Sequence, residues 1–187
     1  MKPILLTSFK PFAGRGINGS STVLCWLRRH LPAGTAQTRI LPVTWEQAPR
    51  FLQNCLQRGR PRWFLGLGEG KSGQVAWETL ARNRMEGTDE IGCEGPAGSI
   101  CPQSPDSLAS TLQLRSPSSW ALPVPLVRSS DAGTFLCNRI LWEVLRHFPA
   151  TQSAFLHLPP QGNMRSADYA RTFGPFVFEI LRDLSGF

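Results

Sequence analysis

Hydrophobic and polar positions divide the chain into short apolar runs and longer stretches in which apolar residues recur every three or four positions. A short apolar run is typical of a buried strand, and the longer spacing indicates a helix with one buried face. Alternation of the two is typical of an α/β layered domain with a largely parallel sheet. The pattern predicts strands at residues 3–8, 37–43, 62–68, 123–130 and 153–159, and helices at residues 21–31, 44–59, 134–148 and 167–184.

One stretch breaks this alternation. Residues 86–121 are rich in glycine, proline and serine and keep no lasting periodicity, so we expect a long, irregular and partly mobile excursion there. The chain has 187 residues, which suits one domain with a full core. We therefore expect a single domain over residues 1–187.

Composition narrows the cellular setting. No apolar run approaches the roughly 18 residues that span a bilayer, and the opening MKPILLTSF is too short for a secretory signal, so we expect a cytoplasmic protein with no membrane contact. The five cysteines are an odd number and show no metal-ligand spacing. They predict free thiols, with neither a disulfide framework nor a metal site.

The net charge of +7 raises the possibility of nucleic-acid binding. The arginines, however, are scattered from Arg15 to Arg182 and form no tight basic cluster. The pattern favours a generally basic surface and no nucleic-acid partner.

Candidate chemistry lies where strands lead into helices, because the carboxyl ends of strands are where α/β sheets hold their active sites. Cys137 begins the helix after one strand, His157 ends another strand, and Glu78 follows the glycine loop after residues 62–68. A cysteine, a histidine and an orienting carboxylate are the parts of a thiol acyl-transfer enzyme.

Each of the three residues also has an ordinary structural interpretation. A cysteine on an apolar helix face is usually a small buried hydrophobe, a histidine at a strand end is often structural, and a glutamate is usually solvated. Spacing along the chain does not show that Cys137, His157 and Glu78 meet in space.

Several segments resemble the pyroglutamyl-peptidase I family, also called pyrrolidone-carboxylate peptidases. They occur in the family's order over nearly the whole chain, and the block around the cysteine is the most specific of them. The matching segments are LLTSFKPFAGRGINGSS, LPVTW, ETLARN, DAGTFLCN and AFLHLP.

The resemblance implies a cytoplasmic cysteine peptidase with a three-layer α/β/α sandwich around a twisted, mostly parallel sheet. It implies a dimer or tetramer that removes an amino-terminal pyroglutamate from peptides through a thioester, without a cofactor or metal. By the same resemblance, Cys137 is the nucleophile, His157 the general acid and base, and Glu78 the third member. Pyroglutamate is a lactam without a free amine, so its pocket needs apolar walls. The matching wall positions are Phe9, Phe12 and Phe135, with Val43 a weaker candidate.

The sequence also departs from the family pattern. Ser8 stands where the family usually has glycine, and Lys10 where it has an acidic residue. The family's arginine after the glutamate block has only Arg84 nearby, in a different register, and the glycine loop before Glu78 differs. Residues 104–121 lack the family's amphipathic helix.

Three hypotheses therefore remain open. The first is an active pyroglutamyl peptidase. The second is a divergent relative that hydrolyses or binds another small lactam or amide, although retention of all three site residues favours an enzyme over a binder. The third is a basic nucleic-acid binder, which a steep salt dependence of affinity would have to support.

Overall fold

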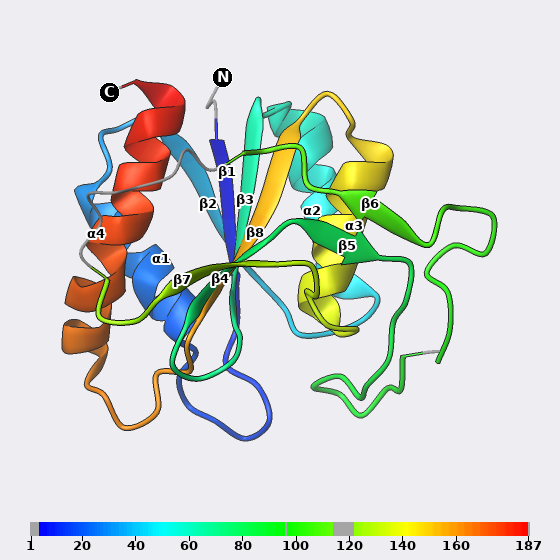
Figure 1. Ribbon diagram of the computed structural model, residues 1–187, viewed down its shortest axis with the longest axis horizontal. Coiled ribbons are helices and arrows are strands. Elements are labelled where there is room, and N and C mark those ends of the chain that lie inside the picture. Colours follow the sequence, from blue (N-terminus) through cyan, green and yellow to red (C-terminus); the bar gives the residue numbers. More distant parts are fainter. Residues whose placement is uncertain (1–3, 96, 114–121, 187) are drawn as a thin grey trace.

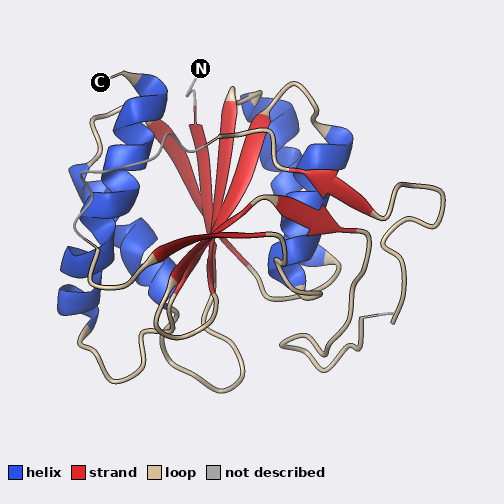
Figure 2. Ribbon diagram, viewed as in Figure 1, coloured by secondary structure: helices blue, strands red, loops and turns tan. Residues whose placement is uncertain are grey.

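The computed structural model describes residues 4–95, 97–113 and 122–186, and it shows a central sheet with helices on both faces (Figures 1 and 2). In chain order the elements are β1 (Ile4–Phe9), α1 (Gly19–His30), β2 (Ala36–Leu41), α2 (Gln47–Gly59), β3 (Trp63–Glu69), β4 (Val75–Glu78), β5 (Leu80–Arg82), β6 (Ser107–Ala109), β7 (Leu126–Ser129), α3 (Leu136–His147), β8 (Gln152–Leu158) and α4 (Ser166–Ser185).

The main sheet has the strand order β2-β1-β3-β8-β4-β7. Strands β2, β1, β3 and β8 are parallel to one another, whereas β4 runs antiparallel to β8 and carries β7 parallel to itself. The predicted α/β class with a mostly parallel sheet is confirmed.

Alternating side chains of the strands bury two apolar layers. Helices α1 and α4 cover one face of the sheet and helices α2 and α3 cover the other (Figure 1). Along β1, Ile4 and Leu6 belong to the core cluster under α1 and α4, while Leu5 and Phe9 belong to the cluster under α2 and α3. Because successive strand residues point to opposite faces, one continuous apolar run supplies both layers.

Three short strands were not predicted from the sequence. Strand β4 lies inside the main sheet, and β5 and β6 form a separate two-stranded antiparallel ribbon. Strands of three or four residues carry too few positions for a period to show, and β6 falls inside the stretch that we expected to be irregular.

The described part of the predicted excursion is held by backbone hydrogen bonds. Glu86 N donates to Thr134 O, which ties the start of the excursion to the segment before α3. Met85 N donates to Gly98 O, which ties Gly98 back to the residue that precedes the excursion. Residues 96 and 114–121 of the excursion lie outside the described residues. Glu90 N also donates to Val43 O, so residues 86–90 lie against the segments that precede α3 and α2.

The helix ends differ slightly from the prediction. Helix α1 begins at Gly19 and is capped by the side chain of Asn18, which accepts a hydrogen bond from Ser20 N. The Thr44 hydroxyl accepts a hydrogen bond from Gln47 N, the first residue of α2, which is one half of a capping-box arrangement. No helix in the described part of the chain is long and apolar enough to cross a membrane.

Candidate active site

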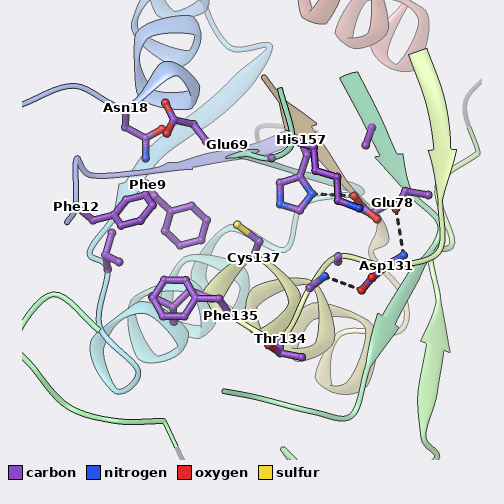
Figure 3. Close-up of a pocket in the computed structure, with 18 of the residues that line it drawn as sticks. Phe9, Phe12, Asn18, Glu69, Glu78, Asp131, Thr134, Phe135, Cys137 and His157 are labelled. Atoms are coloured by element: carbon purple, nitrogen blue, oxygen red, sulfur yellow. Dashed lines mark hydrogen bonds and ion pairs between the residues drawn. The ribbon is translucent and has the colours of Figure 1, made fainter. Parts of the chain in front are cut away.

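A pocket of about 310 Å³ lies at the carboxyl ends of β1, β3 and β8, beside the first turn of α3 (Figure 3). Its lining includes all of the residues that the sequence indicated for the site. These are Cys137, His157 and Glu78, together with Phe9, Phe12, Val43 and Phe135. Residues from five separate segments are thus brought to one place by the fold.

Cys137 is the second residue of α3, and its side chain lies between the His157 ring and the aromatic side of the pocket (Figure 3). Gly68 in β3 and Gly70, directly after the strand, leave room for this pair. A Cβ atom added at Gly68 would lie 2.7 Å from the Cys137 sulfur, and one added at Gly70 would lie 2.6 Å from the His157 Cβ. The end of β3 is therefore shaped to let the cysteine and the histidine approach the backbone closely.

His157 and Glu78 meet across the β4–β8 ladder. The register pairs Ala76 with His157 and Glu78 with Phe155, so Glu78 is the diagonal neighbour of His157 on the same face of the sheet. Glu78 Oε1 lies 2.8 Å from His157 Nδ1, and both side chains are buried. The antiparallel direction of β4 is what brings the carboxylate to the ring.

The charges around His157 favour its protonated form. Burial disfavours a charged ring and by itself lowers the pKa, but the Cys137 thiolate and the Glu78 carboxylate outweigh burial and raise the pKa of His157 to about 10. A positive imidazolium next to a cysteine favours the thiolate, which is the nucleophilic form. The site can hold a nucleophile and a proton donor side by side.

The apolar side of the pocket is built around Phe135, the residue before α3. Its ring contacts Phe12, with centroids 6.4 Å apart, and the edge of Trp45, with centroids 5.0 Å apart. Trp45 is held in turn by its indole nitrogen, which donates to Gly87 O, and by its backbone nitrogen, which donates to Asp89. The first part of the 86–121 excursion thereby supports the aromatic wall.

Several lining residues were not singled out from the sequence, among them Asn18, Glu69, Thr134 and Asp131. Asn18 lies in the loop between β1 and α1, and Glu69 is the last residue of β3. A position at or after the end of a strand was the available signal, but many polar residues occupy such positions. Asp131 Oδ1 accepts a hydrogen bond from Gly133 N and so shapes the turn before α3.

Arg84 is exposed and does not line the pocket, and its guanidinium lies 3.5 Å from Glu86. The described lining contains no arginine. Asn138, the neighbour of Cys137 in the sequence, has a structural role. The buried Asn138 side chain accepts from Arg82 N and donates to the carbonyls of Arg82 and Arg84, which fixes this segment against α3.

Within the described ranges, no group of three or more histidine, cysteine, aspartate or glutamate side chains is arranged to hold a metal ion. The chemistry that the arrangement offers is covalent catalysis by a thiolate, with a histidine as proton donor and acceptor and an apolar slot beside them. The start of α3 adds open backbone N–H groups, because Phe135, at its N-cap, provides no side-chain hydrogen bond.

The sequence model of a family described as pyroglutamyl peptidase matches residues 2–170. A pyrrolidone-carboxylate peptidase of Gloeobacter violaceus is 29% identical over 197 residues, which cover 96% of each chain. One of Pyrococcus furiosus is 30% identical and covers 83% of this chain and 80% of its own. The solved pyrrolidone carboxyl peptidase of Thermus thermophilus superposes with a TM-score of 0.75 at 25% identity, covering 97% of both chains.

Proposed function

Because the chain belongs to the pyroglutamyl peptidase family and is a cysteine peptidase, we propose that Cys137, His157 and Glu78 remove an amino-terminal pyroglutamyl residue from peptides. The observation that carries this proposal is the convergence of these three side chains beside an apolar pocket. The alternative, a relative specialised for another small lactam or amide, is not favoured, since relatives matched over most of their length are named as pyrrolidone-carboxylate peptidases.

The pyroglutamyl ring fits the apolar side of the pocket. Phe9, Phe12 and Phe135 supply aromatic walls and Val43 closes the floor with an aliphatic side chain. A neutral lactam needs no counterion in such a slot. The charged amine of an ordinary peptide terminus would find the Glu69 and Glu78 carboxylates already paired with Arg15 and His157. The slot therefore selects blocked termini.

The reaction begins with the thiolate of Cys137, whose proton rests on His157. The sulfur attacks the pyroglutamyl carbonyl carbon, and open N–H groups in the first turn of α3 hold the oxyanion. His157 then gives its proton to the departing amine as the carbon–nitrogen bond breaks, which leaves a thioester. Water, activated by the neutral ring, hydrolyses the thioester and restores the thiolate and the imidazolium. Glu78 keeps the ring oriented throughout.

The direct test of this function is release of a fluorescent amine from a pyroglutamyl amide under reducing conditions. A prolyl amide, which has the same ring size but a charged amine and no ring carbonyl, is the matched substrate. The pyroglutamyl amide is expected to be preferred by a factor of about 10³ or more, because the prolyl ammonium would be buried unpaired. Equal turnover of the two amides, or no turnover by folded protein, would refute the proposed function.

The pH profile is expected to reflect His157. The pyroglutamyl ring does not ionise, so loss of activity at high pH reports on the enzyme alone. Turnover should persist above neutral pH and fall as pH rises through about 10, where His157 loses the proton that the leaving amine needs. In Glu78→Gln the carboxylate that raises this pKa is absent, so the fall in kcat/KM should move to lower pH. An unchanged midpoint in the variant would contradict the role given to Glu78.

Gly68→Ala is expected to damage catalysis out of proportion to stability. The added methyl group would lie 2.7 Å from the Cys137 sulfur and 2.9 Å from the Phe155 ring, so the sulfur must shift. We expect a loss of about 100-fold in kcat, since a misplacement near 1 Å costs that much, with an overpacking cost of about 1–3 kcal/mol.

Gly174→Ala is the matched control for this effect. Its added methyl group would lie 2.5 Å from the Trp26 ring, where α4 packs on α1 and away from the pocket lining. Thermal unfolding should show destabilisation in both variants, while only Gly68→Ala should lose activity. Equal kcat values for the two variants would show that Gly68 does not position the sulfur.

We also propose that the protein works in the cytoplasm as a homo-oligomer, a dimer or a tetramer. The five cysteines form no disulfide, and a catalytic thiolate needs a reducing compartment. Oligomerisation is carried over from the family resemblance alone. Sedimentation of the intact chain would test it, and a monomer at micromolar concentration would contradict it.

A further inference from the structure

The segment between β1 and α1, which carries Phe12, adopts an unusual backbone conformation. Ala13 and Gly14 in this segment both have positive φ angles, 54° and 71°. A residue with a Cβ is disfavoured in this region, so other contacts must hold the segment. Arg15 N donates to Phe12 O and Asn18 Nδ2 donates to Lys10 O, but both bonds lie within the segment itself.

From outside the segment, Lys10 N donates to Leu41 O, and a side-chain contact comes from Glu69, the last residue of β3. Its side chain is 5% exposed. One carboxylate oxygen accepts a hydrogen bond from Gly19 N at 2.6 Å, and the other pairs with the Arg15 guanidinium at 2.6 Å. A buried carboxylate is stable only when it is paired, so Glu69 fixes both Arg15 and the start of α1.

Arg15 connects Glu69 to the pocket wall through its contact with the Phe12 ring. Its guanidinium carbon lies 4.5 Å from the centre of the Phe12 ring, a cation–π distance, and the Phe12 ring contacts Phe135 next to the nucleophile. Glu69 and Phe12 both lie at the side of the pocket away from Glu78 (Figure 3). A chain of contacts thus runs from the end of β3 through Arg15 to the wall of the slot.

We propose that Glu69 and Arg15 are positioning residues, which act through Phe12 to hold the slot in the shape that binds the pyroglutamyl ring. The inference rests on the proposed function for its substrate, but it concerns ring binding and not bond cleavage. Neither residue touches the reacting atoms. Their removal should therefore weaken binding of the lactam and leave the reactivity of Cys137 intact.

The kinetic test compares wild type with Arg15→Gln, which removes the charge from a half-exposed side chain, and with Glu69→Gln, which keeps an oxygen for Gly19 N. Each variant should raise KM for a pyroglutamyl amide about three- to tenfold, the size of a lost cation–π contact, with kcat within about twofold. The double variant should raise KM no further than the worse single variant, because both changes break one chain of contacts.

Arg171→Gln is the matched control, since Arg171 also pairs with a carboxylate but lies on α4, outside the pocket lining. Its KM should equal that of wild type. Melting curves identify any variant that fails to fold. Because Arg15 is 43% exposed, Arg15→Gln decides the matter if Glu69→Gln unfolds.

A second readout does not require turnover. The lactam 2-pyrrolidone should protect Cys137 from iodoacetamide, and the protecting concentration should rise three- to tenfold in Arg15→Gln, in line with the change in KM. The unprotected alkylation rate should not change. The measurement is made by peptide mapping in a Cys101→Ser background, because Ser104 and the backbone of Gln103 lower the pKa of the Cys101 thiol.

The two proposals fail in different ways. If the lactam protects Cys137 but no pyroglutamyl amide is cleaved, the proposed function is wrong and the protection data alone decide the positioning role. Equal KM and equal protection in wild type and Arg15→Gln would overturn the inference. So would a fall in kcat and alkylation rate without a change in KM, or failure of the lactam to protect wild type.

Discussion

Cys137→Ala should abolish turnover of a pyroglutamyl amide, with kcat falling by about 10⁵-fold or more. The reason is that the proposed acyl intermediate forms on the Cys137 sulfur. Cys137 is the single cysteine of the described pocket lining, and the Glu78 carboxylate is already paired with His157. Binding of the substrate should survive, because the apolar slot is intact. The measurement is single-turnover release of the fluorescent amine, together with a binding constant for the uncleaved substrate.

Cys101→Ser is the matched control for Cys137→Ala. Cys101 has the chemical features of a reactive thiol, since the Ser104 hydroxyl and Gln103 backbone lower its pKa, yet it does not line the pocket. Its replacement should leave kcat and KM unchanged. Full activity in Cys137→Ala, or loss of activity in Cys101→Ser, would transfer the nucleophile's role to another residue.

His157→Gln should lower kcat by about 10⁴-fold, the second largest effect that we expect. Glutamine can still hydrogen-bond to Glu78, so the fold around β4 and β8 should be preserved. It cannot hold a transferable proton, so the thiol loses its base and the leaving amine loses its acid. The same substitution combined with Cys137→Ala should be no worse than Cys137→Ala alone, since the two residues act as a unit.

His147→Gln serves as the control for His157→Gln. His147 lies at the end of the same helix that carries the nucleophile, is half exposed and has a glutamate, Glu143, within 3.6 Å. Its replacement should leave kcat unchanged. A loss below tenfold in His157→Gln would show that another group carries the proton.

Much of the architecture could be predicted from the sequence because long elements bury one face. The runs that form β1, β3 and β8 and the helical spacing of α3 were recognisable for this reason, and the class of fold was confirmed. The direction of β4 could not be predicted. A four-residue strand after a glycine loop carries no signal for parallel or antiparallel pairing.

The three candidate site residues also differ in how far local sequence could predict them. The positions of Cys137 and His157 at a helix start and a strand end pointed to chemistry, whereas Glu78 was singled out only by its place after the glycine loop, which is a weaker signal. The position of Glu78 beside His157 depends on the register of the β4–β8 ladder, in which Glu78 is a diagonal neighbour of His157. Glu78 does not come from a parallel strand that ends at the same edge of the sheet as β8. Register is set by tertiary pairing and is not written in local spacing.

The contacts that shape the ring slot were the least predictable. Arg15 and Glu69 are separated by 54 positions, and the sequence of either loop alone gives no reason to pair them. The support of Phe135 by Trp45 likewise depends on how residues 86–95 fold back over the site.

The central claim is that Cys137 becomes acylated by the pyroglutamyl group, and mass spectrometry of an acid-quenched reaction tests it most directly. Intact protein mixed with excess pyroglutamyl amide and quenched within one turnover should gain the mass of one pyroglutamyl group. Peptide mapping should place that group on Cys137 as a thioester that hydroxylamine removes, and Cys137→Ala should gain nothing. Amine release by a protein that never carries the acyl group, or an acyl group found on another residue, would contradict the account.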